Sequence, residues 1–262
     1  MCWSFLNSPI FDPDTGFGGN GVPGTYTMPA FGDDSRINAT AFLGCIQDGP
    51  FKDYQLSLGP GKLVTTHCLT RGIDPTDRIY LNSAAVKNTT DCPTYETFRI
   101  ELEGEPITPT HKMHDGGHAG VGGDMSNFFS SPGDPIFYLH HANLDRVWWH
   151  WQSMKPSRLY EISGYTTSTP PFTNVTLDYP LQMGTIGNTV PIRTVMDIHS
   201  EPNCYTYVWA FFFVFFSSFC FPPTKLVPYR SYSIPPEFLF LCIPFLLYLA
   251  PHISIFFSSF NL

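Results

Sequence analysis

The chain has 262 residues, a formal net charge of −8 and an isoelectric point near 5.5. This acidic balance excludes nucleic-acid-binding proteins that rely on a basic face, while a hydrophobic content of 43% is enough for a sizeable core. Charged residues make up 14% of the chain, below the roughly 25% of typical soluble domains. The 25 prolines and 21 glycines predict long irregular connections between few helices.

Residues 8–92 are rich in Gly, Pro, Asp, Asn and Thr and carry only short apolar runs. Glycine and proline at this density interrupt helices, so we predict long ordered loops here. Apolar residues at helical spacing then predict a short helix over residues 94–103, before Gly104 and Pro106. A second helix is expected to carry His114 and His118 and to stop at the glycine run that ends at Gly123.

A third helix is the most clearly marked element of the chain. Asp134 is a suitable N-cap and Pro135 suits the first helical position. From there the sequence is apolar, aromatic and free of Gly and Pro to about Met154. We therefore predict one long helix over this segment.

The seven cysteines and the sequons bear on the compartment. An odd number of cysteines without a CxxC pair favours buried or free thiols over a disulfide scaffold or a thiolate zinc site. Three N-glycosylation sequons, at Asn38, Asn88 and Asn174, are compatible with a secretory or membrane-associated location. The start of the chain shows no signal peptide, so the sequence leaves the compartment open.

The composition changes abruptly at Tyr205. Residues 205–221 and 238–262 contain no Asp, Glu, Lys or Arg. Apolar segments of roughly 18 residues or more are membrane-span candidates, so one interpretation of this tail is a membrane anchor. The other, which we favour, is an intron read in frame. We therefore divide the chain into residues 1–204 and an apolar tail, residues 205–262.

Histidines on the second and third predicted helices form a candidate metal site. His114 and His118 are four residues apart and share a helix face. His140 and His141 are about 100° apart on a helix, so only one of them can join that pair at one metal. Asp145 lies one turn after His141, where a carboxylate can orient a side chain near the metal or pair with a neighbouring arginine. Three imidazoles suit copper, zinc or iron, which leaves a zinc hydrolase open.

Residues 134–145, Asp-Pro-Ile-Phe-Tyr-Leu-His-His-Ala-Asn-Leu-Asp, resemble the second copper-site signature of tyrosinases and catechol oxidases, the type 3 copper proteins. In that signature the later paired histidine is the ligand, which maps to His141 and leaves His140 beside the ligands. The family's upstream His-x-x-x-His pair maps to His114 and His118. The resemblance covers roughly residues 8–206. It implies a mainly α fold, a partial four-helix copper bundle with long irregular loops, with residues 1–204 as the C-terminal part of the copper-binding domain.

The resemblance also implies a reaction. Family members hold two coppers, each on three histidines, bind dioxygen between them and oxidise phenols or catechols to o-quinones. Only His67 precedes His111 here, so we expect the first copper site to be absent and this chain alone to be inactive. Asp115, after the first ligand, and a glutamate upstream map to positions linked to deprotonation of monophenols. Glu105 is our first choice for that glutamate and Glu103 the second; a solvated loop charge is the alternative.

Two other functions stay open on the sequence. One is a non-catalytic protein that binds a single copper or zinc on the three histidines. The other is a membrane-tethered remnant whose apolar tail dominates its behaviour. A zinc hydrolase ranks last, because no general-base pattern accompanies the ligands. For the copper oxidase the partners are a phenolic small molecule and dioxygen, with no nucleic acid.

Overall fold

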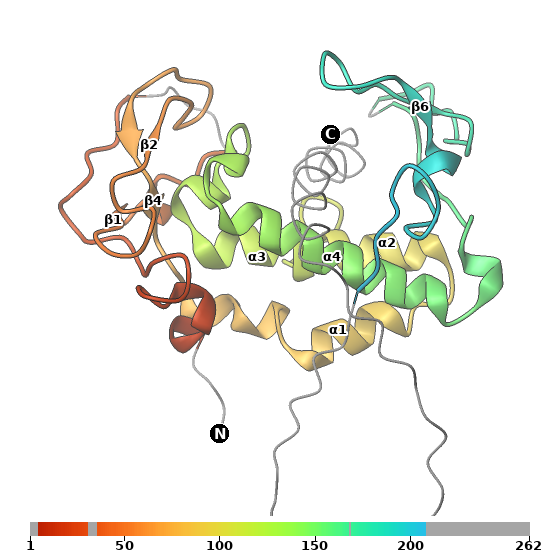
Figure 1. Ribbon diagram of the computed structural model, residues 1–262, viewed down its shortest axis with the longest axis horizontal. Helices are drawn as coiled ribbons and strands as arrows, with labels where there is room; N and C mark the ends of the chain where they lie inside the picture. Colours follow the sequence, from red (N-terminus) through yellow and green to blue (C-terminus); the bar gives the residue numbers. More distant parts are fainter. Residues whose placement is uncertain (1–4, 31–35, 168, 208–262) are drawn as a thin grey trace, which may run out of the picture.

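The computed structural model describes residues 5–30, 36–167 and 169–207 (Figure 1). Its α-helices are α1 (Ser83–Thr90), α2 (Tyr95–Glu103), α3 (Met113–Val121) and α4 (Ile136–Ser153). α3 and α4 lie side by side, with α1 and α2 packed against them. This part of the chain is mainly helical, as predicted.

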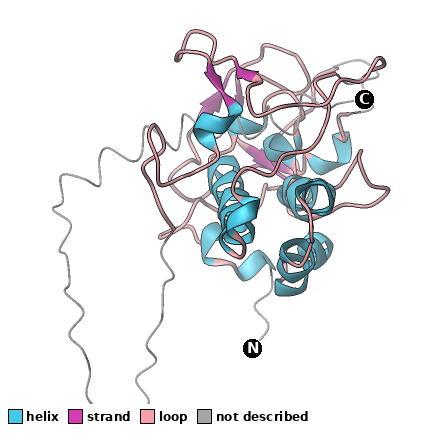
Figure 2. Ribbon diagram, turned by 90° about the vertical axis from the view of Figure 1, so that its right-hand side faces the viewer, coloured by secondary structure: helices cyan, strands magenta, loops and turns pink. Residues whose placement is uncertain are grey.

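Short elements and loops flank the helices on both sides (Figure 2). The described strands pair antiparallel as β1 (Gly44–Cys45) with β4 (Thr70–Arg71), β2 (Gln55–Leu56) with β3 (His67–Cys68), and β5 (Pro180–Leu181) with β6 (Val190–Pro191). The described 3₁₀ helices are Phe5–Asn7, Pro9–Phe11, Ala39–Ala41, Pro75–Tyr80, Gly123–Ser126, Ser131–Gly133, Pro156–Arg158 and Ile192–Val195.

The core between α2 and α4 is aromatic. Thr94 caps α2, because its hydroxyl accepts a hydrogen bond from the Thr97 amide and the Thr97 hydroxyl accepts one from the Thr94 amide. The buried face of α2 packs against α3 and α4 through a cluster of seven buried side chains: Tyr95, Phe98, Leu102, Met113, Leu144, Val147 and Trp151. Burial of each large apolar side chain contributes about 1.5–3 kcal/mol. The predicted helix over residues 94–103 is confirmed to within one residue.

Glycines let α3 approach its neighbours closely. A Cβ added at Gly116 would lie 2.8 Å from Cβ of Tyr80, and one at Gly117 would overlap the ring of His140. Gly122 follows the helix with φ of +69°, a conformation that favours glycine. The predicted end of this helix in the glycine run is confirmed.

A buried ion pair anchors the start of α4. Oδ1 of Asp134 accepts a hydrogen bond from the Ile136 amide at 2.9 Å, which is the role of an N-cap carboxylate. Pro135 already has helical dihedral angles. The guanidinium of Arg71 donates to both carboxylate oxygens of Asp134, at 2.8 and 3.0 Å, and both side chains are fully buried. The long predicted helix is confirmed, with its hydrogen-bonded part starting at Ile136.

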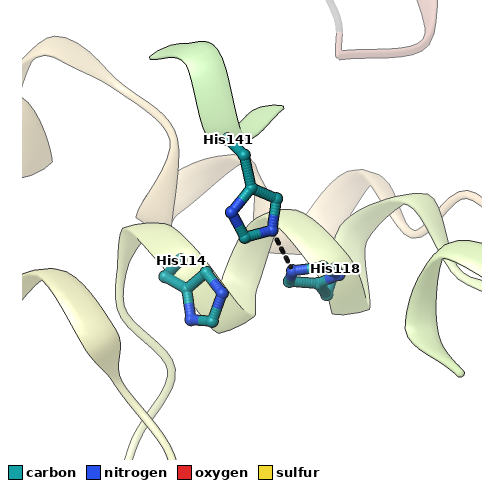
Figure 3. A group of neighbouring side chains, drawn as sticks. All are labelled: His114, His118 and His141. Atoms are coloured by element: carbon teal, nitrogen blue, oxygen red, sulfur yellow. Dashed lines mark hydrogen bonds between the residues drawn. The ribbon is translucent and has the colours of Figure 1, made fainter. Parts of the chain in front are cut away.

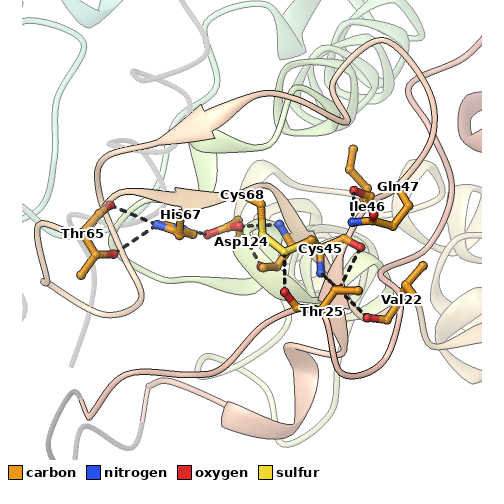
Figure 4. The surroundings of a disulfide bond; sticks show 10 residues. Val22, Thr25, Cys45, Ile46, Gln47, Thr65, His67, Cys68 and Asp124 are labelled. Carbon is orange, nitrogen blue, oxygen red and sulfur yellow. Dashed lines mark hydrogen bonds and ion pairs between the residues drawn. A yellow bond between two sulfur atoms is a disulfide. The ribbon is translucent and has the colours of Figure 1, made fainter.

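Two expectations for the N-terminal region were wrong. Cys45 and Cys68 form a disulfide instead of staying thiols (Figure 4), whereas Cys92 and Cys204 are free. The loop region also contains α1, whose N-cap Asn82 accepts hydrogen bonds from two backbone amides. Composition predicts neither feature. The disulfide depends on a contact between residues far apart in the sequence, and α1 depends on one capping side chain, Asn82.

Both interpretations of the apolar tail, a membrane anchor or an intron read in frame, fall largely outside the described residues, which end at 207. Within the described ranges, no helix has both the length and the apolar character needed to cross a bilayer. Tyr205 and Tyr207 belong to the described part, and their phenols contact Asp145 on α4. Chain beyond the predicted boundary at residue 204 therefore packs on the helical core.

Candidate metal centre

Three histidines from two adjacent helices turn toward one point (Figure 3). His114 and His118 come from one face of α3, and His141 comes from α4. One ring nitrogen of each lies within 4.8 Å of the other two. The Nε2 atoms of His118 and His141 face each other at 3.2 Å. The structure thus brings together the three histidines that the sequence singled out.

The second ring nitrogen of His118 has a firm partner. Its Nδ1 lies 2.8 Å from the carbonyl oxygen of Met125 and 3.0 Å from Oγ of Ser131. An Nδ1–H that donates to the carbonyl leaves the Nε2 lone pair directed at the shared point. The backbone after α3 therefore orients this ring for metal binding.

His114 has a charged partner instead. Its Nδ1 lies 3.4 Å from Oε1 of Glu103, the last residue of α2. The Glu103 side chain is 7% exposed and that of His114 is 15% exposed. A carboxylate on the far side of the ring directs Nε2 toward the other two histidines.

Burial keeps two of the three imidazoles neutral. Removal from water is the main cause that holds the pKa of His118 and of His141 well below the usual histidine value, and neighbouring histidines lower both further. Neutral imidazole is the form that binds a metal. For His114, burial lowers the pKa, but Glu103 outweighs it and the pKa is raised overall. Of the three imidazoles, His114 is therefore the one that favours the protonated form most, because a carboxylate lies beside its ring.

His140 lies beside the three-histidine group without belonging to it: its ring centroid is 5.2 Å from that of His118. Its Nε2 lies 2.8 Å from the carbonyl oxygen of His114, and its ring fills the space that Gly117 leaves open. Burial, followed by the nearby His114, lowers the pKa of His140 to about 3. A neutral His140 thus donates Nε2–H to the backbone of α3 and fixes the spacing between α3 and α4.

Asp115 lies in the first turn of α3, and Glu105 lies beside it in the connection between α2 and α3. The carboxylate of Asp115 accepts hydrogen bonds from the backbone amides of Lys112, at 2.7 Å, and Glu105, at 2.9 Å, and it contacts Nδ1 of His111. The side chain of Glu105 is half exposed and lies 4.0 Å from the same His111 nitrogen. One ligand atom each of Glu105, His111 and Asp115 fall within 4.8 Å of one another. The catalytic role of Glu105 and Asp115 stays a prediction.

Asp145 binds tyrosines that the sequence analysis did not connect with the site. Its Oδ2 accepts a hydrogen bond from Tyr205 at 2.7 Å and lies against the hydroxyl of Tyr207, which is 3.0 Å from the carbonyl of Ala142. Burial raises the pKa of Asp145, and the tyrosine hydrogen bonds partly oppose this. Asp145 thus ties residues 205–207 to α4, one turn after His141.

Several contacts around the ligands were also missed. No local sequence signal predicts that His118 contacts the Met125 carbonyl and Ser131. The same holds for the contact between His114 and Glu103. Each depends on how loops and helices pack. Only Glu103 was singled out earlier, and for another role.

The model for the common central domain of tyrosinase matches residues 3–154. The chain belongs to the tyrosinase family. This tyrosinase-family chain is 32% identical over 219 residues to Tyrosinase-like protein phomQ1 of Diaporthe leptostromiformis, covering 76% of this chain and 52% of that protein. It is 31% identical over 228 residues to Tyrosinase P of Aspergillus terreus, covering 76% of this chain and 63% of that protein.

A further relative is N-acetyl-6-hydroxytryptophan oxidase ivoB of Emericella nidulans, 30% identical over 237 residues, with 76% of this chain and 64% of that protein covered. Among solved structures, a variant polyphenol oxidase from Thermothelomyces thermophila matches with a TM-score of 0.66 and 28% identity. That match covers 79% of this chain and 63% of the other. The tyrosinase-family chain thus spans roughly half to two thirds of the length of these four proteins.

The residues present fit the copper that this family implies. The Nε2 atoms of His118 and His141, which lie within hydrogen-bond distance at 3.2 Å, would both be satisfied by a cation bound between them. Imidazole nitrogens suit copper as ligands. His118 and His141 favour the neutral form, and His114 has a carboxylate behind it. Bound copper would be held by these three side chains.

Proposed function

We propose that this chain supplies the second copper site of a tyrosinase-type oxidase, with copper held by His114, His118 and His141. The observation that carries the proposal is the convergence of three imidazoles from α3 and α4 in a chain of the tyrosinase family. The mutually facing Nε2 atoms of His118 and His141 support a cation at this point.

We propose phenols or catechols as substrates, oxidised to o-quinones with dioxygen. The names of Tyrosinase P and of N-acetyl-6-hydroxytryptophan oxidase describe relatives that act on hydroxylated aromatic rings. Bound copper supplies the electron transfer that couples oxidation of the ring to reduction of dioxygen. The chain's own contribution is to hold three imidazoles in place from rigid helices.

A carboxylate near the copper site would take the phenol proton. The candidates from the sequence are Asp115 and an upstream glutamate, with Glu105 as the first choice and Glu103 as the second. The oxygens of Asp115 already accept hydrogen bonds from two backbone amides, whereas Glu105 is half exposed. A general base needs a free acceptor oxygen within reach of the proton. This difference favours Glu105 over Asp115 for the role.

The alternative is a non-catalytic protein with one copper or zinc on the same histidines. It is favoured by the presence of one three-histidine group in the described residues. Both hypotheses predict that the chain alone is inactive, so an activity assay does not distinguish a single-metal protein from one half of a dicopper oxidase. Sequencing the transcript across both ends of the reading frame separates the two. An upstream exon with helical histidines supports the oxidase, and a transcript that matches this frame supports the single-metal protein.

Copper binding itself is tested on the purified full chain. We expect one copper per chain by elemental analysis and no oxygen uptake with a catechol. His141→Ala should lose the copper, whereas His199→Ala should keep it, because His199 is an exposed residue that contacts Asp197 and Thr206. Copper retained by His141→Ala would refute the assigned site.

A further inference from the structure

We propose that Glu103 is a positioning residue for this copper site: its buried carboxylate holds the His114 ring and gives His114 a stronger donor character than the other two ligands. The inference rests on the proposed copper binding. In this role Glu103 acts on the copper ligand His114. It does not act as a base that removes a proton from the substrate.

The position of Glu103 follows from the junction between α2 and α3. Glu103 ends α2, and Gly104 has φ of +85°, which turns the chain away toward α3. A side chain on Gly104 would collide with Asp115. The turn therefore leaves the Glu103 carboxylate behind the first turn of α3, where Oε1 lies 3.4 Å from Nδ1 of His114.

The buried Glu103 carboxylate needs a positively charged partner. Glu103 is 5% exposed as a residue, and its Oε2 has no hydrogen-bond partner within the described part of the chain. An isolated carboxylate is strongly disfavoured in such a place. The nearby Lys112 is already paired with Glu101, at 2.8 Å. A His114 ring that carries either a proton or a metal cation is the partner that this geometry provides.

The three ligands differ in what stands behind them. The Nδ1 of His118 meets a neutral carbonyl, and the Nδ1 of His141 has no hydrogen-bond partner among the described residues. Only His114 of the three is backed by a carboxylate in these ranges. A negative charge behind an imidazole raises its basicity as a ligand. The extra charge should stabilise Cu(II), which carries two positive charges, more than Cu(I).

The test compares Glu103→Gln with Glu101→Gln in the full chain. Gln keeps the size of the side chain and removes its charge. Glu101 is a matched control, since it lies two residues earlier on the same helix and its carboxylate pairs with Lys112. Cu(II) and Cu(I) dissociation constants are measured by competition with chromophoric chelators, and the Cu(II) site is followed by electron paramagnetic resonance.

We expect Glu103→Gln to weaken Cu(II) binding about 10–100-fold, the range typical of residues that orient metal ligands. Cu(I) binding should weaken less, and the Cu(II) resonance spectrum should change. Glu101→Gln should match the wild type in all three. Equal losses for Cu(II) and Cu(I), or no loss, would overturn the inference. A wild-type chain that binds no copper would instead refute the proposed function.

A second variant covers the case in which Glu103→Gln does not fold. Glu103→Asp keeps the charge but withdraws it by one methylene from the His114 ring. We expect weaker Cu(II) binding with Cu(I) binding near that of the wild type. Wild-type affinity for Cu(II) in Glu103→Asp would show that the position of the carboxylate has no influence on the ligand.

Discussion

Gly117 faces the ring of His140 across the contact between α3 and α4. In Gly117→Ala the new Cβ would overlap this ring, and the ring's hydrogen bond to the His114 carbonyl would be displaced. Overpacking of this kind costs about 1–3 kcal/mol. We expect a loss of that size in the free energy of unfolding, measured by urea denaturation.

Gly120→Ala on the same helix is the control for Gly117→Ala. Its added Cβ would lie 3.2 Å from Cβ of Asp77, a contact that a small shift relieves. Alanine is favoured over glycine inside a helix by about 1 kcal/mol. The control should therefore be near neutral. Equal stability of both variants would show that His140 does not set the helix spacing.

His67 provides a pH-dependent contact at the residue scale. Its Nε2 lies 3.0 Å from Oδ1 of the fully buried Asp124 (Figure 4). The hydrogen bond that the His67 ring donates to Asp124 is the main cause that raises the pKa of His67 above its usual value of 6.5. A histidine whose pKa is higher in the folded state than in the unfolded state stabilises the fold. This stabilisation is complete below the pKa of the unfolded state and is lost as pH rises through the pKa of the folded state.

We therefore expect His67→Asn to destabilise the fold most below pH 6.5 and progressively less above it. The measurement is the difference in free energy of unfolding between wild type and variant at several pH values. Taking the difference cancels groups that titrate alike in both proteins. A difference that grows as pH rises would contradict the expected sign.

At the scale of elements, Arg71 and Asp134 join β4 to the start of α4. Arg71→Ala leaves a fully buried carboxylate without its partner, and breaking such a pair costs about 3–5 kcal/mol. Arg193 and Asp178 form an exposed pair on the surface, with a nitrogen–oxygen distance of 2.7 Å. Exposed pairs contribute little to stability, because water and salt screen their charges. Urea denaturation of Arg71→Ala and Arg193→Ala should show this contrast, and similar losses would refute it.

The elements also show which parts of the fold can be predicted from local sequence. α2, α3 and α4 were predicted because caps, glycines and apolar spacing act within a few residues. α1 was missed because composition outweighed the cap at Asn82. The disulfide joins cysteines 23 residues apart, and their pairing depends on β1 and β3 meeting in space. The same limit applies to the site: the ligand spacing is local, whereas the partner of His114 comes from another helix.

At the scale of the whole molecule, the folded unit has a predicted boundary at residue 204. The contacts of Tyr205 and Tyr207 with the buried Asp145 argue for a boundary after residue 207. A chain that ends at residue 203 removes both phenols and leaves the buried Asp145 carboxylate without these two donors. The loss of partners of a buried polar group costs about 1–3 kcal/mol, and more for a charged one.

We expect a chain that ends at residue 207 to unfold at a higher denaturant concentration than one that ends at residue 203. Asp145→Asn in the longer chain separates the cause, because the amide still accepts a hydrogen bond but has no charge. This variant should unfold at a denaturant concentration between those of the two truncated chains. Equal stability of both truncations would place the boundary before Tyr205. Since Asp145 lies one turn after His141, copper binding should weaken together with stability when the tyrosines are removed.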